Sequence, residues 1–591
     1  MNTRVFALAI VVSLSMAAVS QGIDLPEKWV FSDVNFLNDK EVDSFLAVMK
    51  TAKEAGANCM NLKDPQFAFM EMCPKSYHDN VARVKKAADE LGLKIVPTIF
   101  PFGYSGGYIV QDMNLAGGLP VRNALFVVKN GVATPDPAGA PDLENLGFEE
   151  ARRNVFPGWT TQDHPGLCSF ADTEVKHSGQ SSLKITALDK LPEGDRRRGR
   201  QCRLTQRVNT KPFQYYHVTL WIKTDGIQAE GEDYLVVTSA DGKRRLSYTN
   251  IKAQATQDWT MHSVTFNTME STSIDFSVGA SGGRGGTIWF DDVSVEPAGL
   301  SNLLRSQTKP FRVTSRYGTV VYEEGKDFEP VKDPNLGKEA LELTYYFPFP
   351  SWVWHKGPDI VLTKDSRISE GDKIAVSYFH PVLIYNDQIT VSMEDPKVFD
   401  LMDKQMKNVH EAFHASGYVM NYDEIRILGW EEQADGAKLS PGQILSQHIA
   451  KGVEIVKKYA PGATTYTWSD MFDPRHNARR IDGPGYYLCN GDFSGSWLGL
   501  PSEVVIMNWG GTGEWFAKRG HKQMLAAYYD QDAVQSVNRW LGRTYKLGNV
   551  VGMSYTTWQK KYDDIPAFFK AIQDWDPATA QQVPERRHWE E

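Results

Sequence analysis

Apolar and polar residues follow two different rhythms along this chain of 591 residues. Near its beginning, short apolar runs at 29–36, 57–62 and 93–103 alternate with segments at 39–56 and 77–92, in which apolar residues recur every three to four positions. The first pattern is typical of buried strands and the second of amphipathic helices. Strands and helices that alternate at this spacing predict parallel βα units.

Between about residues 145 and 297 the helical rhythm disappears. Short segments of alternating apolar and polar residues, such as 177–186, 215–224 and 287–297, are separated by residues that favour turns. This pattern predicts an all-β sandwich. A β-like pattern then continues to about residue 393.

The βα rhythm returns with a helical pattern at 395–417. Five apolar runs follow it, at 418–424, 464–472, 503–509, 523–530 and 549–558. Three strands before the interruption and five after it make eight, and eight βα units predict a closed barrel. The predicted fold class is therefore α/β: a (β/α)8 TIM barrel interrupted after strand 3 by an inserted all-β jelly-roll sandwich.

The changes of rhythm also predict the domain boundaries. We expect a first barrel part over 24–139, the sandwich over 140–300, a β-rich insertion over 301–393 and a second barrel part over 394–585.

The first twenty residues have the pattern of a signal peptide. Arg4 precedes an apolar run over 5–16, and small residues before Gln21 predict cleavage near Ser20. The run is too short to cross a bilayer comfortably, and no later run is long enough. We therefore expect a secreted or periplasmic protein without a membrane span.

The composition argues against several classes of binding partner. The chain is 41% hydrophobic and 23% charged, its net charge is −9, and it has no basic tract, so nucleic acid is not expected as a partner. The five Cys residues show no metal-binding spacing, and we expect neither a metal nor a cofactor. Cys168 and Cys202 are candidates for a disulfide.

The ends of the predicted barrel strands carry the candidate site, because catalysis in such barrels occurs at the carboxyl ends of the strands. Asp423 and Glu424 end the fourth strand, and buried carboxylates are costly unless chemistry needs them. Trp side chains offer apolar faces on which a sugar ring can stack, which predicts an oligo- or polysaccharide substrate. The candidate substrate-binding residues are Trp468, Asp470, Trp509, Tyr528, Asp530 and Trp558.

The adjacency of the two carboxylates bears on the mechanism. A retaining glycosidase with an enzyme nucleophile needs two carboxylates about 5 Å apart across the scissile bond. Neighbouring residues on a strand face different ways. We therefore expect Glu424 to protonate the leaving oxygen, while Asp423 orients a substrate group that attacks in place of an enzyme carboxylate.

Five short motifs, in the order in which they occur along the chain, resemble those of the β-N-acetylhexosaminidases of glycoside hydrolase family 20. The resemblance is that of a distant relative. The motifs are YDEIR (422–426), TWSDMFD (467–473), MNW (507–509), YYD (528–530) and TTW (556–558). The resemblance implies a substrate-assisted retaining mechanism in which Glu424 is acid then base, Asp423 steadies the acetamido N–H and Tyr528 binds the acetamido oxygen. The segment 145–297 resembles carbohydrate-binding modules of the family 4/9 type.

Three alternatives stay open at this point. Asp470, Asp473 or Asp530 could supply a second carboxylate for a substrate without an acetamido group. The chain could instead be a glycan-binding protein without activity. Glu424 and Asp423 could also form a structural ion pair with Arg426 or a neighbouring Lys, and the Trp residues could pack the barrel core.

Overall fold

A computed structural model describes residues 25–577 except 192–199, 229–233, 282–284, 338–353, 386–387, 434–435 and 511. Eight parallel strands close into a barrel, with three strands from the first part of the chain and five from the last, which confirms the predicted strand count. In order around the barrel they are β1 (Glu27–Asp33), β2 (Cys59–Lys63), β3 (Lys94–Ile99), β19 (Gly417–Met420), β20 (Thr464–Trp468), β21 (Val505–Asn508), β22 (Gln523–Tyr528) and β23 (Val550–Thr556). The predicted signal peptide lies outside the described residues.

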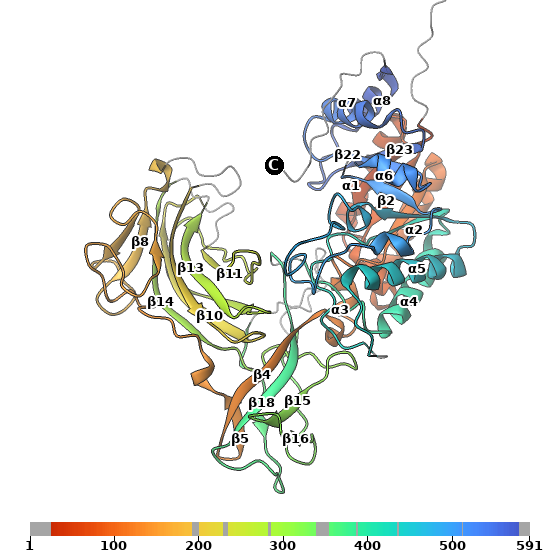
Figure 1. Cartoon of the computed structure of the whole chain (residues 1–591). Helices are drawn as coiled ribbons and strands as arrows, with labels where there is room; N and C mark the ends of the chain where they lie inside the picture. Colours follow the sequence, from red (N-terminus) through yellow and green to blue (C-terminus); the bar gives the residue numbers. More distant parts are fainter. Residues whose placement is uncertain are drawn as a thin grey trace, which may run out of the picture.

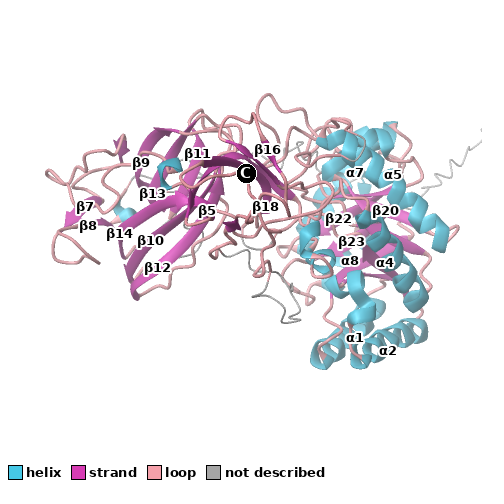
Figure 2. Cartoon of the chain, turned by 90° about the horizontal axis from the view of Figure 1, so that it is seen from below, coloured by secondary structure: helices cyan, strands magenta, loops and turns pink. Residues whose placement is uncertain are grey.

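Helices pack around the barrel and bury one large hydrophobic cluster against it (Figure 2). Their limits follow from local signals: the Asn38 side chain caps the first helix, Gly92 ends the second in a left-handed conformation, and Ser440 opens the fifth with a capping box. They are α1 (Asp39–Glu54), α2 (Lys75–Leu91), α3 (Gly106–Ile109), α4 (Lys397–Phe413), α5 (Pro441–Tyr459), α6 (Gly513–Lys518), α7 (Ala533–Thr544) and α8 (Ile565–Asp574).

Two antiparallel sheets form between β3 and β19 in the chain, and we call them the two-sheet region. The five-stranded sheet has the order β12 (Gln257–Asn267), β10 (Tyr215–Asp225), β14 (Thr287–Pro297), β8 (Ser182–Thr186) and β7 (Ser169–Asp172). The four-stranded sheet has the order β11 (Leu235–Ser239), β13 (Ser273–Ser281), β9 (Gln201–Asn209) and β6 (Thr161–Gln162). Alternate residues of both sheets meet in one hydrophobic cluster, which includes Val218, Phe266, Phe276 and Phe290.

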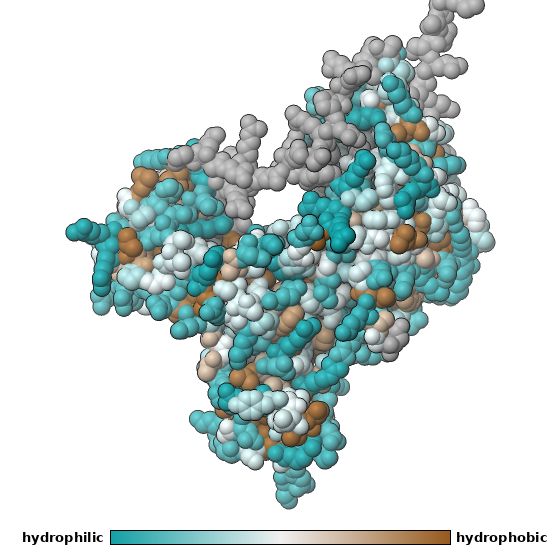
Figure 3. All heavy atoms as spheres, in the orientation of Figure 1, coloured by the Kyte–Doolittle hydropathy of each residue, from teal (hydrophilic) through white to brown (hydrophobic). Residues whose placement is uncertain are grey.

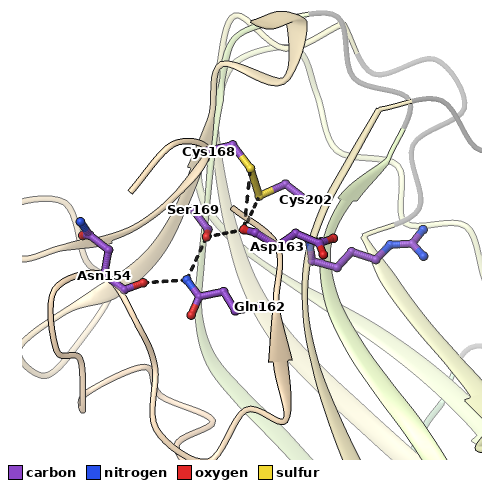
Figure 4. Close-up of a disulfide and its surroundings, with 7 residues drawn as sticks. Asn154, Gln162, Asp163, Cys168, Ser169 and Cys202 are labelled. Carbon is purple, nitrogen blue, oxygen red and sulfur yellow. Dashed lines mark hydrogen bonds between the residues drawn. A yellow bond between two sulfur atoms is a disulfide. The ribbon is translucent and has the colours of Figure 1, made fainter. Parts of the chain in front are cut away.

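A disulfide joins Cys168 to Cys202 in this region, as the sequence allowed (Figure 4). The side chain of Gln162 lies beside it and donates hydrogen bonds to the carbonyl of Asn154, at 2.7 Å, and to the hydroxyl of Ser169, at 2.8 Å. Among the described residues, Cys59, Cys73 and Cys489 are free thiols.

A third, six-stranded sheet lies between the barrel and the two-sheet region (Figure 1). Its order is β16 (Val321–Tyr322), β15 (Arg312–Ser315), β18 (Lys373–Pro381), β4 (Gly118–Lys129), β5 (Val132–Pro135) and β17 (Ile360–Val361). The segment that pairs as β4 and β5 was predicted to belong to the first barrel part, over 24–139. The barrel strands of that part end with β3, because β4 pairs antiparallel with β18 and not with a barrel strand.

The surface adds two observations. On the face drawn in Figure 3, apolar residues form small, separate patches among polar ones. Within the described ranges, no helix has the length and apolar character that crossing a membrane requires.

Candidate active site at the carboxyl end of the barrel

Strained backbone marks three of the strand ends. Phe100 follows β3 with φ of 57°, Glu424 lies just beyond β19 with φ of 45°, and Tyr528, Tyr529 and Asp530 at the end of β22 have φ of 95°, 62° and 61°. A side-chain-bearing residue in this region costs on the order of 1–3 kcal/mol, and such residues cluster at functional sites. The strain lies at the end of the barrel where the predicted carboxylates lie.

Asp423 is a carboxyl group with an unused oxygen. Its Oδ1 is buried and has no hydrogen-bond partner. The chain approaches so closely that a Cβ on Gly103 would lie 1.8 Å from the carbonyl oxygen of Asp423, so only glycine fits there. Burial, followed by the charges of Asp470 and Glu424, raises the pKa of Asp423 to about 8, against a smaller opposing effect of Lys63. Ionisation of Asp423 is therefore disfavoured in this environment.

Glu424 has the opposite environment, since donors reach both of its oxygens. Its Oε2 accepts hydrogen bonds from the Tyr104 hydroxyl at 2.7 Å and from Gln388 Nε2 at 2.8 Å. Its Oε1 accepts one from Arg426 Nη2 at 2.9 Å, which is the ion pair considered from the sequence. The side chain of Glu424 is 25% exposed. Burial and the charge of Glu424 raise the pKa of Tyr104 well above its usual range, so this hydroxyl remains a donor.

Asp470, in the short 3-10 helix Asp470–Phe472 after β20, contacts the backbone beside the two carboxylates. Its Oδ2 accepts the backbone N–H of Glu424 at 3.1 Å and the Asn477 side chain at 2.9 Å. Its Oδ1 accepts the indole N–H of Trp509 at 3.3 Å. Burial is the main cause that raises the pKa of Asp470 to about 6. Asp470 therefore fixes the backbone of Glu424 and the ring of Trp509.

Asp473 is a further buried carboxyl group near the same loop. One oxygen accepts the backbone N–H of Arg475 at 2.8 Å, and the other is buried without a partner. Burial raises its pKa to about 7.

Two of the predicted tryptophans come together as an aromatic wall. Trp468 donates its indole N–H to Asn421 Oδ1 at 2.7 Å, and its ring centroid lies 6.1 Å from that of Trp558. The Trp558 ring is also 5.3 Å from Phe31 and 6.0 Å from Tyr529. Trp468 is buried, whereas Trp558 is 52% exposed. The wall is therefore packed inside the barrel and open to solvent at its outer end.

Tyr528 is not brought to this site, although the resemblance implied that it binds substrate. Its hydroxyl donates to Asp564 at 2.7 Å, and its ring stacks on Tyr555 with centroids 4.2 Å apart. Met524 and Ala526 of the same strand face the barrel interior, so strict alternation would have placed Tyr528 there as well. The left-handed backbone at Tyr528 breaks the alternation, and the ring joins the outer cluster instead.

Asp530 holds a loop. It accepts the backbone N–H groups of Trp558 at 2.8 Å and Gln559 at 3.2 Å, and its other oxygen accepts the Thr557 hydroxyl. Both oxygens are therefore engaged by the segment after β23, and Asp530 acts on the site by placing Trp558.

Sequence reasoning missed Tyr104 and Gln388. Tyr104 follows the third barrel strand, so reading that strand end would have found it. Gln388 lies between β18 and α4, where no local pattern marks it. Among the described residues, no group of three or more His, Cys, Asp or Glu side chains is arranged to hold a metal ion.

Comparisons with known proteins leave the family open. No protein-family model matches the chain. No curated protein matches it either.

Solved structures are similar only in part. A chitobiase of Flavobacterium johnsoniae is 14% identical at a TM-score of 0.24, over 33% of this chain and 31% of its own. The carbohydrate-binding module TmCBM61, in complex with β-1,4-galactotriose, is 20% identical at a TM-score of 0.20, over 26% of this chain and 97% of its own. A xylan-binding domain from Paenibacillus barcinonensis is 15% identical at a TM-score of 0.19, over 26% of this chain and 91% of its own. Similarities at this level assign neither a family nor an activity.

Proposed function

We propose that this protein is an exported glycoside hydrolase that removes β-linked N-acetylhexosamine from chain ends by a substrate-assisted retaining mechanism. The observation that carries the proposal is the contrast between two adjacent carboxyl groups at the end of β19. Asp423 has a buried oxygen without a partner. Its neighbour Glu424 is partly exposed and held by three donors.

The reaction has two steps. In the first, the acetamido oxygen of the substrate attacks the anomeric carbon, the bond to the leaving oxygen breaks, and Glu424 gives that oxygen a proton. In the second, Glu424 takes a proton from water as the water opens the oxazolinium intermediate. We assign this role to Glu424 because its side chain is 25% exposed and donors hold both of its oxygens. The unused Oδ1 of Asp423 accepts the acetamido N–H.

The electrostatics of the site suit this chemistry. Asp423 and Asp470 have raised pKa values because burial and neighbouring negative charge disfavour ionisation. A positive charge that develops on the sugar ring and the acetamido group relieves this repulsion, so the cluster stabilises the transition state more than the ground state. Trp558 and Trp509 supply the apolar surface against which a sugar ring stacks.

We also propose that the two-sheet region is a jelly-roll carbohydrate-binding-like module inserted after the third barrel strand. Two observations support this. The strands from β6 through β14 form two antiparallel sheets around one hydrophobic core, and the sequence motifs occur in the order expected of such a module. Export rests on the sequence of residues 1–20 alone.

Hydrolysis of paired aryl glycosides tests the activity. The substrates are β-N-acetylglucosaminide and β-N-acetylgalactosaminide against β-glucoside and β-galactoside, with the parent, Glu424→Gln and Asp423→Asn. We expect turnover only of the N-acetyl sugars, and a loss of roughly 10²–10⁴-fold in kcat for both variants. Glu432→Gln is the matched control, because Glu432 is an exposed neighbour that pairs with Arg312.

Two other results would redirect the assignment. Turnover of plain glycosides that survives Asp423→Asn would exclude substrate assistance. It would then favour Asp473 as the second carboxylate, since this buried group has an oxygen without a partner. Tight glycan binding without turnover in the parent would instead identify a binding protein.

A further inference from the structure

A buried arginine of the two-sheet region contacts a barrel loop beside the candidate site. Arg244 lies in the loop after β11, and its side chain is 2% exposed. Its guanidinium donates to the carbonyl oxygens of Tyr487, at 2.7 Å, of Cys489, at 3.2 Å, and of Pro484. All three acceptors belong to the loop between β20 and β21 of the barrel. One side chain of the inserted region therefore donates to three backbone carbonyls of this barrel loop.

That loop contacts Arg426, which in turn contacts Glu424. Tyr487 has φ of 47°, and its ring centroid lies 4.5 Å from the guanidinium carbon of Arg426. The N–H of Leu488 donates to the carbonyl of Arg426 at 3.1 Å. Arg426 in turn donates to Glu424 Oε1 at 2.9 Å. The contacts run without a gap from Arg244 through Tyr487 and Arg426 to the candidate acid.

The choice of arginine has a physical reason. Burying a guanidinium costs several kcal/mol unless it is paired and hydrogen-bonded. Arg244 has the three carbonyls and the carboxylate of Glu270, at 3.5 Å, as partners, while its Nε has none. Its planar fork can meet several carbonyls at fixed angles, whereas a lysine ammonium is a point charge on a flexible stem. The fork of Arg244 holds the carbonyl of Tyr487, a residue whose left-handed backbone costs on the order of 1–3 kcal/mol. We expect that without that restraint the strained residue relaxes and its ring moves away from Arg426.

We propose that Arg244 is a positioning residue of the active site, so that the two-sheet region is an integral part of the catalytic unit rather than a separable binding module. The inference rests on the proposed glycosidase function. Arg244 acts on Glu424 through Tyr487 and Arg426 and does not touch the substrate. A second contact supports it: the ring of Tyr248, four residues further along the same segment, lies 5.7 Å from the ring of Tyr487.

The test compares Arg244→Ala and Arg244→Lys with Arg207→Ala in the full chain. Arg207 is the matched control, because it lies on β9 of the same sheet and makes a partly exposed ion pair with Asp275. We expect both Arg244 variants to lose roughly 10–100-fold in kcat, with KM changed less than about threefold, as displaced catalytic groups do. Arg207→Ala stays within about twofold of the parent. Millimolar guanidinium chloride restores part of the lost kcat in Arg244→Ala, whereas methylammonium chloride and sodium chloride do not.

Thermal melting shows whether the variants fold. If Arg244→Ala does not fold, Tyr487→Leu tests the same contact from the barrel side, since it removes the ring beside Arg426 and changes no residue of the two-sheet region. A parent without turnover would refute the proposed function, and the positioning role with it. An active parent with folded Arg244→Lys or Tyr487→Leu at unchanged kcat would overturn the positioning role alone, as would an equal effect of guanidinium on Arg207→Ala.

Discussion

Two carboxyl groups in the segment after β19 have contrasting surroundings. Glu431 is saturated: its Oε2 accepts hydrogen bonds from Lys309 at 2.8 Å and from the hydroxyls of Thr308 and Ser392, both at 2.6 Å. Its Oε1 accepts the backbone N–H of Gly118 at 3.1 Å. The side chains of Glu431 and Lys309 are 2% and 0% exposed.

Asp423 lies in the same segment and has none of this compensation at Oδ1. Its strongest electrostatic neighbours, Asp470 and Glu424, are negative and raise its pKa. Folded proteins satisfy nearly all buried polar groups, so an unsatisfied one needs a reason. The contrast teaches that Glu431 joins the barrel to the six-stranded sheet, whereas Oδ1 of Asp423 makes no hydrogen bond to the described protein.

The largest expected effect is on the saturated group. Lys309→Met leaves Glu431 buried without its cation, and breaking a buried pair in this way costs about 3–5 kcal/mol. Urea unfolding of the variant and the parent measures this loss. Lys75→Met is the control, because its ion pair with Asp79 is on the surface and is worth less than about 1 kcal/mol. Equal losses in both variants would show that Glu431 and Lys309 are not a structural link.

Replacing the unsatisfied group, in Asp423→Asn, should change the free energy of unfolding in the opposite direction. The pKa of Asp423 is about 8 in the folded state and about 3.9 when unfolded, so the folded state binds the proton more tightly between these values. The parent therefore loses stability as pH rises through this window, and Asp423→Asn does not incur this loss. The free energy of unfolding of Asp423→Asn should exceed that of the parent at pH 8, by a difference that grows with pH by up to about 1.4 kcal/mol per pH unit.

Unfolding of both proteins at pH 5 and pH 8 measures the difference. The exposed Asp43, replaced by Asn, is the control and should give no such trend. A constant difference between Asp423→Asn and the parent at the two pH values would show that Asp423 is ionised in the folded protein.

The comparison also shows what the sequence could predict. The barrel strands and the adjacent pair Asp423 and Glu424 follow from local periodicity and from the rule that parallel strands end at one face of the barrel. The partners that distinguish Asp423 from Glu431 do not, because Lys309, Thr308 and Ser392 come from segments distant from Glu431 in the chain. No single-sequence pattern shows which of two carboxylates will meet them.

Backbone strain is the reason why the position of Tyr528 was not predicted from the sequence. Alternation along β22 holds for Met524 and Ala526 and fails at Tyr528, where φ turns positive. Non-glycine residues rarely adopt this conformation, so residue type did not signal the break. The predicted end of the first barrel part at 139 failed for a related reason, since β4 looks the same whether it pairs in the barrel or in another sheet.

Removing one donor from Glu424 should have an intermediate effect. Tyr104→Phe deletes the 2.7 Å hydrogen bond to Oε2 but keeps the ring and its packing. A hydrogen bond to a charged group is worth about 1.5–3 kcal/mol, so kcat/KM should fall roughly 10–100-fold if Glu424 needs this placement. Steady-state hydrolysis of the preferred aryl glycoside gives the value. An unchanged kcat/KM would make Glu424 as insensitive to its surroundings as a surface carboxylate.

The smallest expected effect on activity belongs to Tyr528→Phe, which separates the observed site from the one that the sequence motifs implied. The variant loses the hydrogen bond to Asp564 and should lose about 1 kcal/mol in the free energy of unfolding. Its kcat/KM should stay within about threefold of the parent, because the hydroxyl lies outside the barrel interior. A loss as large as that of Tyr104→Phe would mean that Tyr528 turns toward the substrate when the site is occupied. The distinction between satisfied and unsatisfied groups would then hold for the empty barrel alone.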